Sequence, residues 1–427
     1  MSQILAHGPV VGSGIADARG QRKTDAFGDW VAETMSESTN PWPDLAGGPA
    51  SGARTLARIW DLPTRLFHWL LVIAVFFAAT TGFFAPANGL TWHVWFGYAI
   101  GALVVWRLIW GLFGSEYARL DRLFGALANV REHFAGLWRG KPKHYAGHNP
   151  AGSLMILGLI LVLLGITATG LVVLGGAEKQ GVLAGVTSYQ FGHLAKGAHQ
   201  LLAYLLMAMI AGHLAGVVIE MVLLRVPLIR GMITGWLPAG GEGEAARARD
   251  GTPLKALIST VFAAVAIAAA WLPLSALAGL GVPSPVTANA TFVRECGSCH
   301  WPFHPSLLPR ASWKAVMSSL DQHFGEDATL PEATASEIAA YLDTHAAETA
   351  DTEPANRLRE VSASEPRRIT ETRFWQRTHN DLRPELFKSA AVKSKANCLA
   401  CHADAATGRF DDQLIDIPHK PSTGAMQ

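Results

Sequence analysis

Five long apolar stretches constrain the fold of this chain more than any other feature. Each is long enough to cross a hydrocarbon core of about 30 Å. The stretches run near residues 66–86, 91–113, 153–175, 197–223 and 255–280. Inside a bilayer the backbone polar groups must pair with one another, and a single segment achieves this only as a helix. The sequence therefore predicts a mainly α protein with five transmembrane helices.

Basic residues fall on alternate sides of these stretches. Arg and Lys are frequent before the first stretch, between the second and third, and between the fourth and fifth, whereas 87–90 has none and 176–196 has only Lys179 and Lys196. Short cytoplasmic loops are enriched in Lys and Arg. We therefore expect a multi-pass protein of a bacterial inner membrane, with its N-terminus in the cytoplasm and residues from 282 onward in the periplasm.

All four cysteines of the chain belong to two C-x-x-C-H motifs. These are Cys296 and Cys299 followed by His300, and Cys398 and Cys401 followed by His402. At this composition a single match by chance is expected about 10⁻³ times. The motif is the attachment signal for c-type haem, with the two thiols bound covalently and the histidine on the iron. A thioredoxin-like pair, a disulfide and a zinc site are the alternatives, and the placement of each His directly after its second Cys disfavours them.

Four histidines lie within the apolar stretches, where a polar side chain is costly. They are His68, His93, His199 and His213. A core histidine bonded to a backbone carbonyl is the plain alternative for any one of them. His199 and His213 are fourteen residues apart, which places them about 21 Å apart along one helix and on nearly the same face.

The predicted topology pairs these four residues. His68 and His213 lie toward the cytoplasmic side, and His93 and His199 lie toward the periplasmic side. Each pair is expected to bind the iron of one haem b from both sides, an arrangement that suits electron transfer. The pairs are too far apart to share one zinc ion. Arg65 and Arg107 are candidates for pairing with the haem b propionates, and snorkelling to the headgroups is the alternative.

The membrane part resembles the bacterial cytochrome b561 family, which includes b-type subunits of nickel-iron hydrogenases. The matching segments are 60–69 (WDLPTRLFHW), 92–98 (WHVWFGY), 147–150 (GHNP) and the region from His199 to 232–235 (MITG). The resemblance covers about 56–236. It implies a four-helix bundle with two haem b groups that exchanges electrons with membrane quinone, and it implies the same four histidine ligands.

The C-terminal part is similar to the dihaem cytochrome c family. The matching segments include 295–300 (ECGSCH), 307–309 (LLP), 320–327 (LDQHFGED) and 368–373 (RITETR). That family usually has bis-histidine haems, which implies His323 as the second ligand of the first haem c iron and His379 as that of the second. His304 stands where a proline is expected, so it either competes as a ligand or covers the haem edge.

Four segments follow from these patterns. Residues 1–53 are expected to form a disordered cytoplasmic tail, 54–236 a four-helix cytochrome b domain, 237–281 a loop and a fifth, tethering helix, and 282–427 a small, helical, loop-rich periplasmic dihaem cytochrome c domain. The net charge of +1 argues against a nucleic-acid partner.

The function expected from this organisation is electron transfer between the quinone pool and a periplasmic haem protein or redox enzyme, in the manner of a quinol:cytochrome c oxidoreductase. The expected cofactors are two haem b and two covalent haem c, with quinone or quinol as exchangeable substrate. One alternative is superoxide oxidation at the haem b domain with quinone as acceptor. A haem-based sensor or docking anchor is a third hypothesis, for which the sequence shows no output segment.

Overall fold

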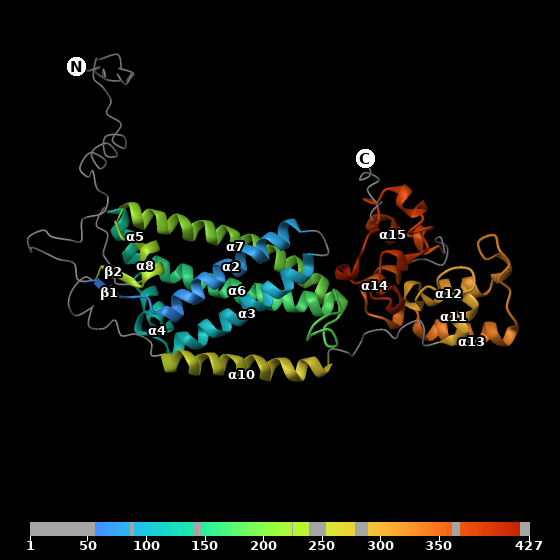
Figure 1. Ribbon diagram of the computed structural model, residues 1–427, viewed down its shortest axis with the longest axis horizontal. Coiled ribbons are helices and arrows are strands. Elements are labelled where there is room, and N and C mark those ends of the chain that lie inside the picture. The colour runs from blue at the N-terminus through green and yellow to red at the C-terminus, as the bar shows by residue number, and fades with distance from the viewer. Residues whose placement is uncertain are drawn as a thin grey trace, which may run out of the picture. The chain divides into compact units, whose positions relative to one another are not determined.

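The computed structural model describes residues 56–85, 89–139, 145, 147–223, 225–238, 253–277, 289–360 and 368–418. The predicted tail at 1–53, most of the loop before the fifth helix and the link at 278–288 lie outside these residues. Within them the regular secondary structure is almost all helical (Figure 1).

Five helices are long and apolar enough to cross a membrane, which confirms the main expectation from the sequence. They are α2 (Leu62–Phe84), α3 (Leu90–Phe113), α6 (Pro150–Gly176), α7 (Tyr189–Leu223) and α10 (Pro253–Leu277). Two of them begin at side-chain caps: Asp61 accepts from the backbone N–H of Thr64 at 2.7 Å, and Asn149 accepts from that of Gly152 at 2.6 Å.

Helix α7 begins earlier than the hydropathy of the sequence predicts. The apolar stretch starts near residue 197, whereas the helix starts at Tyr189. Ser188 accepts from the backbone N–H of Phe191 at 3.3 Å and so supports this first turn. The additional turns carry polar residues and lengthen α7 beyond the apolar segment. The link between α6 and α7 is therefore short, spanning 177–188.

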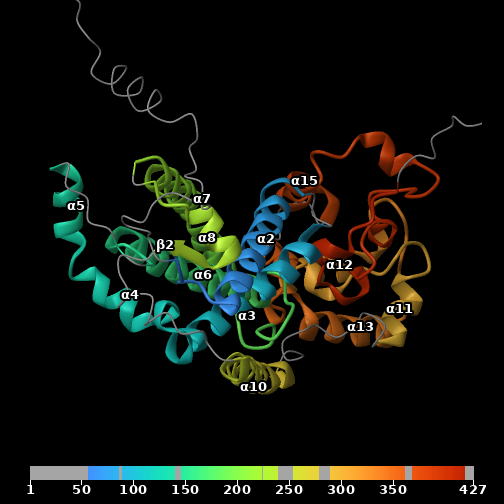
Figure 2. The same cartoon turned by 60° about the vertical axis from the view of Figure 1, so that its left-hand side comes forward.

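Helices α2, α3, α6 and α7 pack together as a bundle (Figures 1 and 2). Small and branched side chains fill its centre, including Ala74, Ala78, Val104 and Leu163. The outward side chains are apolar and exposed, as lipid contact requires.

Helix α10 packs against α3 outside the four-helix bundle (Figure 2). Two contacts at different levels hold it: Trp106 Nε1 donates to Thr260 Oγ1 at 3.1 Å, and the rings of Tyr98 and Trp271 lie 5.3 Å apart. The fifth helix is thus a packed element as well as a connection.

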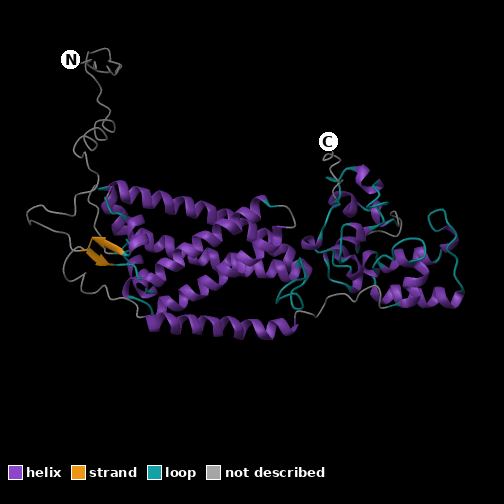
Figure 3. Ribbon diagram, viewed as in Figure 1, coloured by secondary structure: helices purple, strands orange, loops and turns teal. Residues whose placement is uncertain are grey.

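A two-stranded antiparallel sheet joins the two ends of the four-helix domain (Figure 3). Strand β1 (Leu56–Arg58) precedes α2, and strand β2 (Trp236–Pro238) follows α8 (Leu228–Thr234). Gly235 ends α8 with a φ of 90°, a conformation that glycine adopts without strain. The connection between α3 and α6 holds η2 (Glu116–Ala118), α4 (Leu120–Leu127) and α5 (Val130–Trp138).

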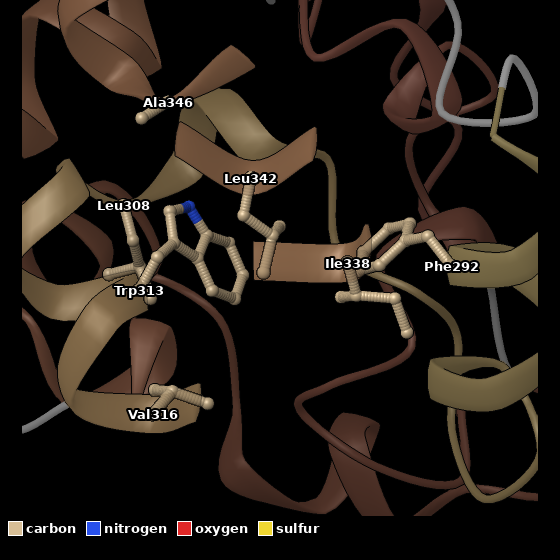
Figure 4. Packing of buried hydrophobic residues seen from close by; sticks show 7 residues of the cluster. All are labelled: Phe292, Leu308, Trp313, Val316, Ile338, Leu342 and Ala346. Atoms are coloured by element: carbon tan, nitrogen blue, oxygen red, sulfur yellow. The ribbon is translucent and has the colours of Figure 1, made fainter. Parts of the chain in front are cut away.

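The C-terminal domain consists of short helices around a small apolar core (Figure 4). Trp313 lies in that core with Phe292, Ile338 and Leu342, and its Nε1 donates to the carbonyl of Pro305 at 2.6 Å. The α-helices are α11 (Ala290–Cys296), α12 (Arg310–Met317), α13 (Glu332–His345), α14 (Glu353–Leu358) and α15 (Arg373–Thr378). Single 3₁₀ turns connect them: η4 (Pro305–Leu307), η5 (Leu320–Gln322), η6 (Ala347–Thr349), η7 (Ile369–Glu371), η8 (Pro384–Lys388), η9 (Cys398–Ala400), η10 (Ala405–Thr407) and η11 (Asp412–Leu414).

Candidate haem-binding sites

His93 and His199 face one another inside the membrane bundle. Their ring centroids are 6.0 Å apart, with an angle of 81° between the ring planes. His93 Nδ1 donates to the carbonyl of Ala78 at 2.9 Å, and His199 Nδ1 donates to that of Ile166 at 3.1 Å. A carbonyl only accepts, so each Nδ1 carries the proton and each Nε2 keeps its lone pair for a metal.

Two glycines make room for these rings. A Cβ on Gly82 of α2 would lie 2.9 Å from the His93 ring, and a Cβ on Gly170 of α6 would lie 3.2 Å from the His199 ring. Each histidine therefore packs against a helix that presents no side chain at that level. Neither glycine can be identified as a site residue from the sequence, because a helical glycine gives no signal until its neighbour is known.

The spacing of the two rings fits a shared iron. A metal–nitrogen bond of about 2 Å on each side, plus about 1 Å from each nitrogen to its ring centre, separates the two centroids by about 6 Å. Direct packing of two imidazoles would allow a closer approach. The separation therefore matches bis-imidazole ligation of one metal ion.

His68 and His213 form the second membrane pair. The structure brings them close enough for their charges to interact. His68 Nδ1 is buried and finds no hydrogen-bond partner among the described residues. His148 lies beside this pair, since the charges of both His213 and Arg107 act on it. Burial, followed by those two charges, lowers the pKa of His148 to about 3, so it is neutral at physiological pH. His148 was not among the site residues predicted from the sequence.

Arg107 is a buried cation with unused hydrogen-bonding capacity. Its residue is only 4% exposed, and its Nη1 has no partner among the described residues. The carboxylate of Asp61 acts on it electrostatically while accepting from Trp110 Nε1 at 3.2 Å. A buried guanidinium with a free N–H suits an anionic group such as a propionate. Arg65 likewise has a buried Nε without a partner among the described residues, while its Nη1 donates to the carbonyl of Ile233 and so ties α2 to α8.

The C-terminal domain holds two further pairs of facing histidines. His300 and His323 have ring centroids 6.2 Å apart, and His379 and His402 also lie 6.2 Å apart. The ring planes differ by 19° in the first pair and by 69° in the second. Each pair joins the histidine of a C-x-x-C-H motif to the partner that the family resemblance implied. Both separations match the membrane pair.

Backbone contacts orient these rings as well. His300 Nδ1 donates to the carbonyl of Trp301, and His379 Nδ1 donates to that of Trp375, both at 2.8 Å. Trp375 also stacks on His379 at 4.3 Å. Burial, and then the charge of His379, lowers the pKa of His402 to about 4, which favours the neutral imidazole that binds metal.

The four cysteine thiols are free, and none is in a disulfide. Burial is the main cause that raises the pKa of Cys296 and of Cys398 to about 11, so neither is a thiolate at neutral pH. No group of three or more His, Cys, Asp or Glu side chains in the described part of the chain is arranged to hold a metal ion. The residues present instead fit haem, with paired imidazoles for the iron and neutral thiols for covalent attachment.

His304 is a buried structural residue in this geometry. It is 3% exposed, and its Nδ1 accepts from the backbone N–H of Ser306 at 3.2 Å, which caps η4. A Cβ on Gly408 would lie 2.5 Å from the same nitrogen. The ring is thus enclosed between the regions of the two C-x-x-C-H motifs, while His323 occupies the place opposite His300.

Facing histidine pairs in a multi-pass helical bundle, joined to a small helical domain with two C-x-x-C-H motifs, define a membrane-bound haem protein of electron transport. Residues 59–235 match the family Prokaryotic cytochrome b561, and residues 292–410 match the family Dihaem cytochrome c. Residues 59–235 thus form a cytochrome b561 domain, and residues 292–410 of the same chain form a dihaem cytochrome c domain.

Curated relatives of the membrane domain are probable Ni/Fe-hydrogenase B-type cytochrome subunits. The protein from Azotobacter vinelandii is 25% identical over 134 residues (26% of this chain, 55% of the relative). That from Cupriavidus necator is 28% identical over 130 residues (24% and 52%). The chain spans about half the length of these relatives.

Solved structures similar to the C-terminal domain are dihaem cytochromes c. The protein from Rhodobacter sphaeroides is 35% identical, with 29% of this chain and 96% of that chain covered and a TM-score of 0.23. The protein from Shewanella baltica is 31% identical, with 30% and 93% covered and a TM-score of 0.25.

Proposed function

We propose that this protein carries electrons between the membrane quinone pool and a periplasmic redox partner. The observation that supports it most strongly is the equal spacing of three histidine pairs, at 6.0, 6.2 and 6.2 Å, in two domains of one chain. Such pairs leave no open position on an iron, so they suit electron transfer and not oxygen chemistry.

We assign one haem to each pair. His68 with His213, and His93 with His199, would hold two haem b groups, and Arg107 would pair with a propionate of the first. His300 with His323, and His402 with His379, would hold two haem c groups attached through Cys296 and Cys299 and through Cys398 and Cys401. Haem supplies reversible one-electron chemistry, while the chain fixes ligands, orientation and solvent access.

The orientation belongs to the same proposal. Covalent haem c attachment in bacteria takes place outside the cytoplasm, so the C-terminal domain is assigned to the periplasm and the N-terminus to the cytoplasm. The Arg and Lys distribution supports this independently. The partner is then a soluble haem protein or redox enzyme of the periplasm.

Anaerobic stopped-flow spectroscopy of the detergent-solubilised protein tests the function. A quinol should reduce the haem c bands, and the His199→Ala variant should lose this reaction. His345→Ala is the control, since that exposed histidine donates to the carbonyl of Tyr341 and does not belong to a facing pair. Reduction of haem b by superoxide, without quinol-driven reduction of haem c, would favour the superoxide alternative.

A further inference from the structure

Lys179, in the link between α6 and α7, is buried against the C-terminal domain. It is 5% exposed, and its Nζ donates to Asp351 Oδ2 at 2.5 Å and to the carbonyl of Thr187 at 2.9 Å. A buried ammonium that loses its carboxylate is strongly destabilised. The link therefore has this conformation because the C-terminal domain supplies the matching charge.

The start of α7 makes the second contact with the same region. The backbone N–H of Tyr189 donates to Asp351 Oδ2 at 2.9 Å, and its hydroxyl donates to Glu353 Oε1 at 3.0 Å. Arg357 lies over the Tyr189 ring at 5.7 Å. Residues at the start of α14 thus satisfy polar groups at the first turn of a membrane helix.

The third contact is a chain of hydrogen bonds through the side chains of Thr91, Gln413 and Gln180. Thr91 Oγ1 donates to Gln413 Oε1 at 2.8 Å, and Gln413 Nε2 donates to Gln180 Oε1 at 2.9 Å. Gln180 Nε2 in turn donates to Asp411 Oδ2 at 2.5 Å. These amide contacts are directional, so they fix a register as well as a proximity.

Both sides of this surface are adjacent to histidine pairs. Thr91 precedes His93 by two residues on α3. Gln413 precedes Ile415 by two residues, and Ile415 forms a β-bridge with His402. The backbone N–H of Asp416 also donates to the carbonyl of Cys401 at 2.9 Å. Through Gln413, the surface thus connects the His93/His199 pair to the second C-x-x-C-H site.

We propose that 177–189 and Thr91 form a docking surface for the chain's own haem c domain, which places the His379/His402 site next to the membrane bundle. The His300/His323 site is then the outer end that meets the soluble partner. The order of the sites rests on the proposed function, whereas the docking does not. A quinol oxidised to quinone would release two electrons and two protons, and the protons would go to solvent. Each electron would then pass from the His93/His199 site to the His379/His402 site, on to the His300/His323 site and finally to the periplasmic acceptor, which it would reduce.

The order is the reverse of that suggested by the sequence. The chain leaves α10 and reaches Cys296, in the first motif, about a hundred residues before Cys398. Sequence order alone would put the first site nearest the membrane. The docking contacts instead come from 351–357, which lie between the two motifs in the chain, and from 411–413, which lie beyond the second motif.

Disulfide cross-linking in the holoprotein tests the docking. Haem attachment consumes all four native cysteines, so an introduced pair is the only pair of free thiols. Thr91→Cys with Gln413→Cys should form a disulfide under mild oxidation, detected by mass spectrometry of the linked peptides. Thr91→Cys with Glu326→Cys, at the turn that carries His323, is the matched control. A control pair that cross-links equally well, or a first pair that does not cross-link in protein with full haem content, would overturn the docking.

Two further variants test whether the Lys179–Asp351 ion pair holds the haem c domain on the docking surface. Lys179→Met and Asp351→Asn should each slow cross-linking of the first pair several-fold, and the double variant should be no slower than either alone. Additive effects of the two changes would show that the ion pair does not hold the surface together. Lys314→Met on α12, which lies outside the contacts, should leave the rate unchanged.

The order of the sites needs a separate measurement. His379→Met changes the spectrum of the second haem c only, so it marks that site. In stopped-flow with quinol, the marked spectrum should appear in the first phase of haem c reduction. Its appearance in the second phase would reverse the proposed order. Absence of any reduction would contradict the proposed function while the cross-linking result still decides the docking.

Discussion

Four histidines in two different domains share one orienting device. His93, His199, His300 and His379 each donate Nδ1–H to a backbone carbonyl, at 2.8–3.1 Å. The device fixes both the tautomer and the ring plane, and it makes the imidazole a better ligand. A core histidine would show the same bond, so the facing partner ring is what distinguishes a ligand.

The pairing makes a residue-level prediction for the membrane haems. His68→Ala and His213→Ala should remove the same haem b, and His93→Ala and His199→Ala should remove the other. A pyridine haemochrome assay should show half the haem b in each variant, and a redox titration should show which component is lost. Equivalent titrations for His68→Ala and His199→Ala would refute the pairing.

The raised pKa of the Glu178 carboxyl predicts a pH dependence of the docking. Burial, and then the charges of Asp412, Glu353 and Asp411, raise the pKa of this carboxyl from 4.5 to about 7, against the opposing charge of Lys196. Three of these carboxylates belong to the haem c domain, so the docked state binds the proton more tightly than the undocked state. The contribution of Glu178 to docking is therefore fully present below pH 4.5 and is lost as the pH rises through about 7.

The cross-linking rate of the Thr91→Cys/Gln413→Cys pair measures this effect, after correction for thiol ionisation with a pair inside one domain. We expect the corrected rate to fall between pH 5 and pH 7.5, and Glu178→Gln to flatten the fall. Burial also raises the pKa of Asp412, so part of the dependence should remain. A corrected rate that rises with pH would contradict the assignment.

The glycines that face the histidine rings are needed for haem b binding, because a side chain at either position would meet the ring. Gly82→Ala should displace the His93 ring and lower haem b content, even though alanine favours a helix more than glycine does. Gly97→Ala on α3 is the matched control, because its Cβ would meet nothing within 4 Å. Haem content measured by absorbance in the two variants decides the point. Equal content would mean that the ring has room to move.

The sequence predicted the membrane elements well and their contacts poorly. Apolar length alone locates α2, α3, α6, α7 and α10, because a bilayer sets the helix length. The same criterion missed the first turns of α7, where Tyr189 and its neighbours are too polar to be recognised. The C-x-x-C-H motifs were readable because their chemistry requires a fixed spacing. Lys179 and Gln413 gave no local signal, since their roles depend on residues far away in the chain.

Across the whole molecule, topology is the first property to test. We expect a periplasm-active reporter fused at residue 290 to be active and one fused at residue 50 to be inactive, with the reverse for a cytoplasm-active reporter. The physical reason is the excess of Arg and Lys on one side of the helices. If one reporter were active at both positions, residues 50 and 290 would lie on the same side of the membrane, and one of the five helices would not cross it.

The acidic residues near His323 predict that the soluble partner is basic. Asp321, Glu326 and Asp327 lie within four residues of His323 in the chain and are exposed, and 321–353 contains no Lys or Arg. Acidic residues at an exposed site steer a basic partner, and such steering weakens with salt. Electron transfer to a basic soluble cytochrome should slow several-fold between low and physiological ionic strength.

The triple variant Asp321→Asn, Glu326→Gln and Asp327→Asn should flatten this salt dependence while haem content is retained. Neutralising Glu332, Glu337 and Asp343 on α13 is the control for net charge, and it should have a smaller effect. A rate that does not change with salt in the unmodified protein would leave the acidic run without a role in association.

The β1–β2 pairing explains why the chain needs an odd number of crossings. Leu56 lies opposite Pro238, so the four-helix domain begins and ends on the same side of the bilayer. A domain appended directly after Pro238 would remain on that side, at the opposite end of the bundle from Thr91 and Lys179. One additional traverse, α10, reverses the side. A fusion of these two domains in this order therefore needs one further membrane crossing between them. Helix α10 is long and apolar enough to provide it.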